Sequence, residues 1–224
     1  MPNWCDTKFV FYGNKNEILE FYNRLKRILD SPNHISNKFK KSWLGNILMD
    51  YGFDWENAPC RGNVDDIADD VTVEGNEACF SLNTTSAWSP LTEMWDLILK
   101  KEYPSVKYVY LAIEPGAGIF INTDTSGKYL PEKHLLDLIL PNDEDGEDID
   151  VYEFYDSPEE LLEDLEKYTG KKFKDIDKAR RFFEEKLDEI EDVYGEYHAI
   201  IAEFKTDETN KEEAYEAVNA YQNI

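Results

Sequence analysis

Three cysteines and three histidines are the side chains best suited to metal binding or nucleophilic catalysis. They are Cys5, Cys60, Cys79, His34, His134 and His198. A local zinc site needs closely spaced ligands, and the chain has no C-x-x-C pair and no H-x₃₋₅-H pair. The 48 acidic residues allow many Cys–His or Ser–His trios with an orienting acid, and no G-x-S-x-G elbow selects one. We therefore expect no metal, no cofactor and no catalytic residue that the sequence can name.

An acidic segment at residues 141–153 (PNDEDGEDIDVYE) has the composition of a calcium-binding loop. With Gly146 as the central glycine, Asp143 and Asp145 fall on ligand positions. The first ligand position then falls on Pro141 and the closing bidentate position on Tyr152, and both fail. A solvated acidic connector is the simpler interpretation, and weak calcium binding of another kind is the alternative.

The segment Glu114–Gly118 (EPGAG) shares only its glycines with a phosphate-binding loop. It lacks the lysine and the following helix of such loops, so a tight turn after a strand is the simpler interpretation. A carboxylate beside a tight turn can accept hydrogen bonds from backbone N–H groups or from a tryptophan indole. We predict this structural role for Glu114, with ligand binding as the alternative.

Three tryptophans, Trp4, Trp55 and Trp88, lie outside the clear helical stripes. Packing in a core with satisfied indole N–H groups is the plain interpretation. The alternative is an aromatic pocket for a partner or a small ligand, rimmed by Glu114 and Asn3. These five residues are the candidate binding residues of the sequence.

The stretch Pro2–Cys5 (PNWC) comes directly before an apolar run. We interpret it as an anchor in which Trp4 and Cys5 tie the N-terminus to the first strand. This interpretation predicts an ordered terminus and a largely buried Trp4 side chain.

Over about the first 130 residues, the sequence predicts strands and helices that must position these candidate residues. Aromatic and β-branched runs predict strands at 8–12, 71–73, 77–85, 106–113 and 118–122. Apolar residues at helical spacing predict helices after Asn14 and after Ser89-Pro90. The order strand, helix, strand, strand, helix, strand is typical of a ferredoxin-like split βαβ arrangement, an antiparallel sheet with two helices on one face. The predicted fold class is α+β.

Residues 33–69 interrupt this pattern, and we interpret them as an insertion on the core fold. A short helix is predicted at 42–51, and a polar loop is predicted from there to Asp70.

The C-terminal third is the acidic part of the chain. Residues 142–224 hold 28 acidic and 10 basic residues, a net charge of −18, whereas residues 1–141 have a net charge of −6. The pattern predicts a strand at 151–155, a helix starting at Ser157-Pro158, a second helix from Ile176, a strand at 196–204 and a short terminal helix. We predict a ferredoxin-like domain at 1–133 and an acidic, helix-rich extension at 134–224 that packs on it.

The whole chain carries 24 basic and 48 acidic residues, a net charge of −24. Such a surface repels phosphate backbones and anionic lipids, so we expect neither nucleic acid nor a membrane as a partner. No apolar stretch is long enough to span a bilayer, and the N-terminus lacks the features of a signal peptide. We therefore predict a cytoplasmic protein, for which the charge serves either solubility or a basic protein partner. The sequence does not indicate the oligomeric state.

Four short segments, in this order along the chain, resemble a known family. They are Pro2–Cys5, Trp55 within Tyr-Gly-Phe-Asp-Trp, Phe80 followed by Ala87-Trp88-Ser89-Pro90, and Glu114-Pro115-Gly116 followed by Phe120. Over about residues 1–130 the chain resembles the ferredoxin-like domain of YubB-like proteins of phages and plasmids. Ile121 and Asn122 depart from the family, which has a glycine soon after the last phenylalanine. The resemblance implies an accessory protein of a mobile element, and it implies no reaction.

The leading hypothesis from the sequence is a cytoplasmic, non-enzymatic accessory protein whose acidic extension binds a basic protein partner. The alternative is a small-molecule-binding or hydrolytic domain with a site near Trp4, Trp88 and Glu114. An open cavity joining these three residues would favour the alternative, and tight packing with every polar atom satisfied would count against it.

Overall fold

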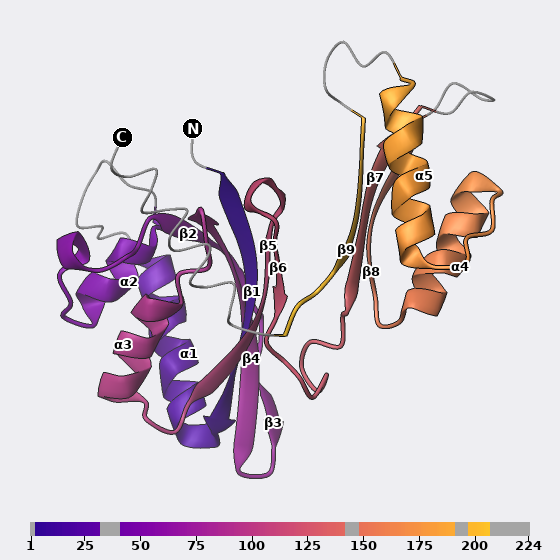
Figure 1. The fold of residues 1–224 in the computed structure, drawn as a ribbon. Coiled ribbons are helices and arrows are strands. Elements are labelled where there is room, and N and C mark those ends of the chain that lie inside the picture. The colour runs from indigo at the N-terminus through magenta and orange to yellow at the C-terminus, as the bar shows by residue number, and fades with distance from the viewer. Residues whose placement is uncertain (1–2, 32–40, 142–147, 191–196, 207–224) are drawn as a thin grey trace. The chain divides into compact units, whose positions relative to one another are not determined.

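The computed structural model describes residues 3–31, 41–141, 148–190 and 197–206. The chain divides into two compact units, with the boundary between Thr125 and Ser126 (Figure 1). Each unit combines helices with an antiparallel sheet of its own. The predicted α+β class is therefore confirmed.

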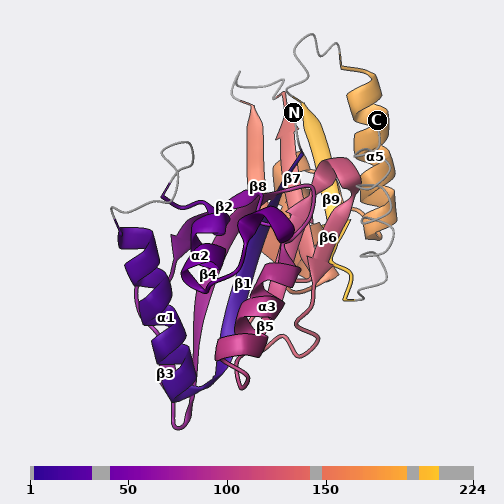
Figure 2. The ribbon, with the colours of Figure 1, turned by 90° about the vertical axis from the view of Figure 1, so that its left-hand side faces the viewer.

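The first unit is built on a six-stranded sheet in the order β2-β4-β1-β5-β6, with β3 paired to β4. Its strands are β1 (Trp4–Asn14), β2 (Gly62–Ile67), β3 (Thr72–Glu74), β4 (Glu77–Ala87), β5 (Lys107–Glu114) and β6 (Ile119–Asn122). The central strand β1 pairs antiparallel with β4 and with β5, so that Phe9 lies between Leu82 and Tyr110. Helices α1 (Lys15–Asp30), α2 (Leu44–Asp50) and α3 (Thr92–Glu102) cover one face of the sheet (Figures 1 and 2).

An aromatic core fixes α1 and α3 on this sheet. Phe11 of β1 stacks on Phe80 of β4 at a centroid distance of 5.4 Å. Its ring also meets Phe21 of α1 and Trp95 of α3 edge-on, at 5.1 and 5.2 Å. All four side chains are buried. Because each such pair adds about 0.5–1.5 kcal/mol beyond burial, the cluster specifies where both helices lie.

The segment predicted as a polar loop up to Asp70 contains strand β2, so that part of the prediction is wrong. The strand pairs with β4, and its register shifts between Val64 and Asp66. Val64 and Ile67 are buried in the first core. The bulge breaks the alternation of apolar and polar residues that marks a strand in a sequence. Helix α2 lies inside the predicted range 42–51 and confirms that prediction.

The second unit is a three-stranded sheet in the order β8-β7-β9 with two helices on one face (Figure 1). Its elements are β7 (His134–Leu140), β8 (Ile149–Tyr155), α4 (Pro158–Thr169), α5 (Ile176–Asp188) and β9 (His198–Glu203). Its core contains Leu136 and Leu138 of β7, Leu161 and Leu165 of α4, and Phe183 of α5. No helix in the described part of the chain is long and apolar enough to cross a membrane.

The strands β8 and β9 and the helices α4 and α5 confirm the predictions for this part, whereas the central strand β7 was not predicted. Its sequence, HLLDLIL, is a leucine run in which Leu135 and Leu136 are both fully buried. A short continuous apolar run cannot be told from a buried helix segment by its period, so the sequence does not reveal this strand. Most of the predicted acidic connector (residues 142–147) and the predicted terminal helix lie outside the described residues.

Candidate functional site

Four of the five predicted binding residues, Asn3, Trp4, Trp88 and Glu114, lie at one end of the first sheet. Asn3 and Trp4 are at the start of β1, Trp88 follows β4, and Glu114 ends β5. Antiparallel pairing places the start of β1 beside the ends of β4 and β5. The carbonyl oxygen of Asn3 accepts a hydrogen bond from the Trp88 backbone N–H at 2.9 Å. We call these four residues the Glu114 corner.

Glu114 has the structural role that the sequence predicts. Its side chain is 2% exposed and accepts backbone N–H groups at both oxygens, Oε1 from Gly116 at 3.0 Å and Oε2 from Ala117. A Cβ on Gly116 would lie 2.8 Å from Glu114 Oε1 and would overlap Asn3 Nδ2. Charge-assisted hydrogen bonds of this kind are strong, so the carboxylate closes the turn of the short helix η2 (Pro115–Ala117).

Trp88 holds a strained backbone conformation within the same corner. Its φ is +75°, and among the described residues it alone has a positive φ without being glycine. Such a conformation costs on the order of 1–3 kcal/mol and persists only where the surroundings impose it. The hydrogen bond to Asn3 and the one from the Ser86 hydroxyl to the Ser89 carbonyl, at 2.8 Å, hold the chain on both sides of Trp88.

The prediction that Trp4 is largely buried is wrong, because its side chain is 48% exposed. Alternate residues of a strand face opposite sides, and the next residue, Cys5, takes the buried side. Burial raises the pKa of the Cys5 thiol to about 12, so the thiol stays protonated. The backbone of Trp4 is nevertheless paired with Ala87. Pro2 lies outside the described residues.

Trp55 packs elsewhere in the first unit. It begins the short helix η1 (Trp55–Asn57), and its ring meets Trp43 edge-on at a centroid distance of 5.3 Å. Its carbonyl accepts the Cys60 thiol at 3.6 Å, and burial raises the pKa of that thiol to about 11. Trp55 therefore fastens the segment between α2 and β2 to the margin of the core.

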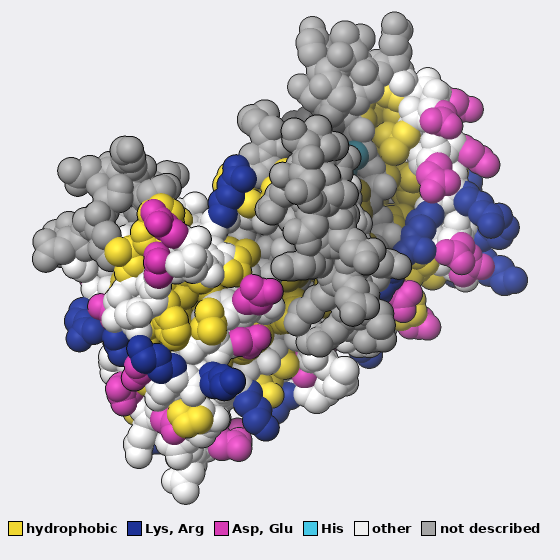
Figure 3. All heavy atoms as spheres, turned by 60° about the vertical axis from the view of Figure 1, so that its left-hand side comes forward, with side chains coloured by type: hydrophobic (Ala, Val, Ile, Leu, Met, Phe, Trp, Pro, Cys, Tyr) yellow, Lys and Arg dark blue, Asp and Glu magenta, His cyan; other side chains and the backbone are white. Residues whose placement is uncertain are grey.

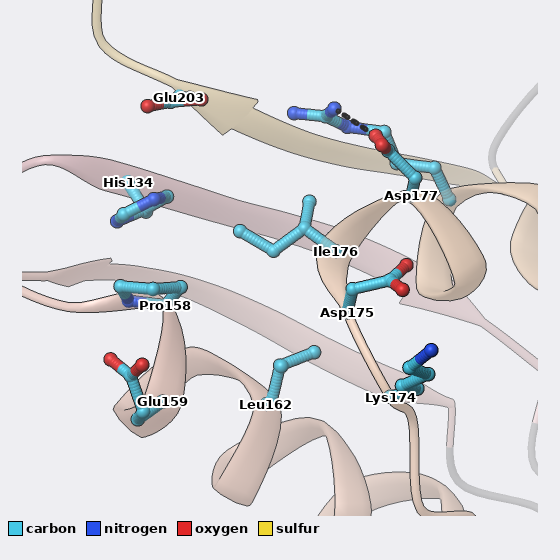
Figure 4. A pocket seen from close by; sticks show the side chains of 10 residues that line it. His134, Pro158, Glu159, Leu162, Lys174, Asp175, Ile176, Asp177 and Glu203 are labelled. Carbon is cyan, nitrogen blue, oxygen red and sulfur yellow. Dashed lines mark hydrogen bonds and ion pairs between the residues drawn. The ribbon is translucent and has the colours of Figure 1, made fainter.

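The second unit holds a pocket of about 380 Å³ that the sequence reasoning missed. It lies where β7 begins, β9 ends, and both helices have their first turns (Figure 4). We call it the His134 pocket. Leu162 and Ile176 give it an apolar wall, and its polar lining includes His134, Glu159 and Glu203.

The sheet and the helix starts bring these residues together. His134 at the start of β7 lies opposite Glu203 at the end of β9. Ser157 caps α4 by accepting the Glu160 N–H at 3.3 Å, and this places Glu159 in the first turn beside the pocket. Asp175 caps α5 in the same way, accepting the Lys178 N–H at 2.9 Å. The serine cap was predicted, but the sequence held no signal for the pairing of β7 with β9.

His134 is a buried imidazole with an incomplete set of hydrogen bonds. It is 5% exposed, and its Nδ1 has no hydrogen-bond partner in the described part of the chain. Burial lowers the pKa of His134; the charges of Arg180 and Lys133 act in the same direction, and those of Glu203 and Glu159 oppose them. The ring is therefore neutral at pH 7. A buried polar atom without a partner is rare and calls for an explanation.

The charged groups of the His134 pocket fall into two sets. Arg180 is fully engaged, donating Nε to the Ile201 carbonyl at 2.7 Å and Nη1 to Asp177 at 3.1 Å. Glu159 and Glu203 have no ion-pair partner among residues 3–31, 41–141, 148–190 and 197–206. The pocket thus combines an apolar wall, a neutral imidazole, two carboxylates without an ion-pair partner in the described residues, and the ammonium of Lys174.

Comparison with known proteins gives no identification. No protein-family model, curated protein or solved structure matches this chain. The resemblance to YubB-like proteins stays a prediction, and function is argued below from the residues of the chain itself.

Proposed function

We propose that the protein is a non-enzymatic interaction module whose second unit binds a basic protein partner through a row of carboxylates on α4. The row consists of Asp156, Glu159, Glu160, Glu163 and Glu166, all exposed. Spacings of three and four residues place Glu159, Glu160, Glu163 and Glu166 on one side of α4, and Asp156 lies just before the N-cap of the helix. This row is the observation that carries the proposal, and we call it the α4 acidic row.

Two tyrosines of the second unit lie beside further carboxylates, which are not members of the α4 acidic row. The Tyr155 hydroxyl donates to Glu153 Oε2 and Asp164 Oδ2, both at 3.2 Å. Burial raises the pKa of Tyr155, and the charges of these two carboxylates raise it further. The pKa of Tyr168 is raised by the same causes. Burial is the largest cause of both shifts, and the part due to Glu153 and Asp164 adds negative charge near α4, which favours an approaching cation.

The α4 acidic row is distinguished by its sequence of charges along one helix. Figure 3 shows Lys and Arg side chains interspersed with Asp and Glu side chains on the faces of both units that it presents, and Glu166 of the row lies 3.9 Å from Lys172. Charges of both signs on one surface are typical of solubility, whereas a row of one sign steers an oppositely charged partner.

For the first unit we propose a ferredoxin-like split βαβ scaffold. The supporting observation is that β1 lies between β4 and β5, with β2 and β3 on the far side of β4 and with α1 and α3 on one face. In this view α2 and β6 are additions to the scaffold. A cytoplasmic accessory role in a mobile element, as the YubB-like resemblance implies, is part of the same proposal.

The alternative, a small-molecule site at Trp4, Trp88 and Glu114, has weaker support. Both oxygens of Glu114 already accept backbone N–H groups of its own turn. A ligand would have to displace these hydrogen bonds, and the turn would lose them.

A labelled octalysine peptide tests the proposed function on the full chain. The variant Asp156→Asn with Glu160→Gln, Glu163→Gln and Glu166→Gln removes four charges of the α4 acidic row. A matched control removes four exposed charges of the first unit by Glu56→Gln, Asp66→Asn, Asp70→Asn and Glu74→Gln. Fluorescence anisotropy measures the dissociation constant at about 20 mM and about 300 mM salt, concentrations that bracket strong and weak screening.

We expect the row variant to bind octalysine roughly tenfold more weakly than the wild type at low salt. Each exposed ion pair contributes about 0.3–0.4 kcal/mol, and the variant removes four carboxylates that could form one. The control should stay within about twofold, and high salt should abolish the difference. Equal losses in the two variants would show that only net charge matters, and the proposed function would then be wrong.

A further inference from the structure

We propose that the His134 pocket receives the alkylammonium group of a lysine side chain, presented by the basic partner that the α4 acidic row attracts. The inference rests on the proposed function and adds the chemistry of recognition to it. The pocket opens at the first turn of α4, where Glu159 belongs both to the pocket lining and to the α4 acidic row.

The size and the apolar wall of the pocket suit a lysine side chain. Its volume of about 380 Å³ lies near the lower end of the range of about 300–1,000 Å³ for ligand pockets. Leu162 and Ile176 offer apolar surface along it (Figure 4). A lysine buries its methylene stem on such a surface while its charged end reaches polar groups.

The polar groups of the pocket match the donors of an ammonium. A lysine ammonium has three N–H donors and no acceptor. In Figure 4 the His134 ring lies between Glu203 and Pro158, and Glu159 lies beyond Pro158. The two carboxylates lack ion-pair partners and Nδ1 of His134 lacks a hydrogen-bond partner within the described chain. An ammonium in the pocket supplies a counter-charge to the carboxylates that line it.

An anion is the competing ligand class, because two helix N-termini and two cations border the pocket. At each helix N-terminus the side chain of the cap residue, Ser157 or Asp175, already accepts a backbone N–H group of the first turn. The guanidinium of Arg180 is bound to Asp177 and to the Ile201 carbonyl. Of the two cations in the pocket lining, Lys174 has no ion-pair partner in the described residues, and it stands against the unpaired charges of Glu159 and Glu203. The balance favours a cation.

The test uses the full chain and small probes with NMR detection of the imidazole signals. The chain has only three histidines, so substitution of His34 and His198 assigns the signal of His134. The probes are Nα-acetyl-lysine methylamide, the norleucine analogue that lacks the ammonium, the arginine analogue, cadaverine and inorganic phosphate. We expect the lysine analogue to shift the His134 signals in a saturable way and the norleucine analogue to leave them unchanged.

Matched variants locate the binding. Glu203→Gln and Glu159→Gln should each weaken the lysine analogue about fivefold or more, because each removes an unpaired negative charge from the pocket lining. Glu160→Gln, which removes an exposed charge next in sequence but outside the pocket lining, should change the affinity by less than about twofold. An equal effect of all three variants would overturn the inference.

The remaining probes separate the sources of the ligand and the two proposals. Saturable shifts with phosphate, or tighter binding of the arginine analogue or of free cadaverine than of the lysine analogue, would overturn the assignment to a lysine side chain. Octalysine binding to the α4 acidic row without any shift of His134 by the lysine analogue would overturn this inference and leave the proposed function in place. A shift of His134 without a loss of octalysine affinity in the row variant would overturn the proposed function instead.

Discussion

The Glu114 corner and the His134 pocket present the same kinds of group in opposite states. Each has carboxylates at the end of a sheet, beside the first turn of a helix. In the corner, both carboxylate oxygens of Glu114 accept hydrogen bonds from N–H groups of its own turn. In the pocket, Glu159 and Glu203 belong to the lining together with His134, whose Nδ1 has no partner in the described chain. The difference separates a carboxylate that builds structure from carboxylates that are available to a ligand.

Removal of the Glu114 carboxylate should have the largest effect on stability. Glu114→Ala leaves the N–H groups of Gly116 and Ala117 without their acceptor, and we expect a loss of about 2–4 kcal/mol in the free energy of unfolding. Urea denaturation measures it, with the exposed Glu74→Ala as control. Glu114→Gln keeps one acceptor oxygen, so its loss in the free energy of unfolding should lie between those of Glu114→Ala and Glu74→Ala. This variant tests the prediction if Glu114→Ala does not fold. A loss below about 0.5 kcal/mol for Glu114→Ala would contradict the structural role of Glu114 and would group it with carboxylates that are available to a ligand.

A substitution in the pocket should act in the opposite direction. His134→Leu replaces a buried imidazole with an unpaired nitrogen by an apolar side chain, and we expect a gain of about 1 kcal/mol in the free energy of unfolding. The same variant should lose the binding of the lysine analogue. A loss of stability of similar size would show that the fold itself satisfies the imidazole, and the contrast with the corner would then fail.

Acid should weaken the second unit through His134. Burial lowers the pKa of His134 below the ordinary value of 6.5, so the folded chain binds fewer protons than the unfolded chain in that range. The contribution of the neutral ring to stability is complete above pH 6.5 and is lost as the pH falls through the lowered pKa. Melting temperatures of the wild type and His134→Leu between pH 7.5 and about 5 should therefore diverge on acidification, the wild type falling further. Parallel curves would mean that the ring is not held neutral by burial.

The smallest stability effect is expected at Glu203. Because this carboxylate has no ion-pair partner among the described residues, Glu203→Gln should change the free energy of unfolding by less than about 0.5 kcal/mol. Urea denaturation beside Glu114→Gln gives the direct comparison between pocket and corner. A loss at Glu203 equal to that at Glu114 would assign both carboxylates to structure.

The sequence by itself determined the features that depend on near neighbours. The apolar residues of α1 recur at helical spacing. Ser157 and Pro158, the predicted start of a helix, are the N-cap and the first residue of α4. The role of Glu114 was also local, because its partners Gly116 and Ala117 follow within three residues. Strands with clear alternation, such as β4, belong to the same class.

Tertiary structure alone decided what depends on distant partners. Near the start of β1, the sequence does not indicate which residues face the helices. Trp4 was therefore predicted to be buried, but its side chain is half exposed and Cys5 is buried in the core. The bulge in β2 interrupts the alternation of apolar and polar residues, and the leucine run of β7 lacks a clear strand period, so neither strand was predicted. The His134 pocket needs β7 beside β9 and two helix starts above them, and His134 meets Glu203 only through that pairing. Periodicity records the neighbours of a residue along the chain, and contacts between remote segments are fixed only when the whole core packs.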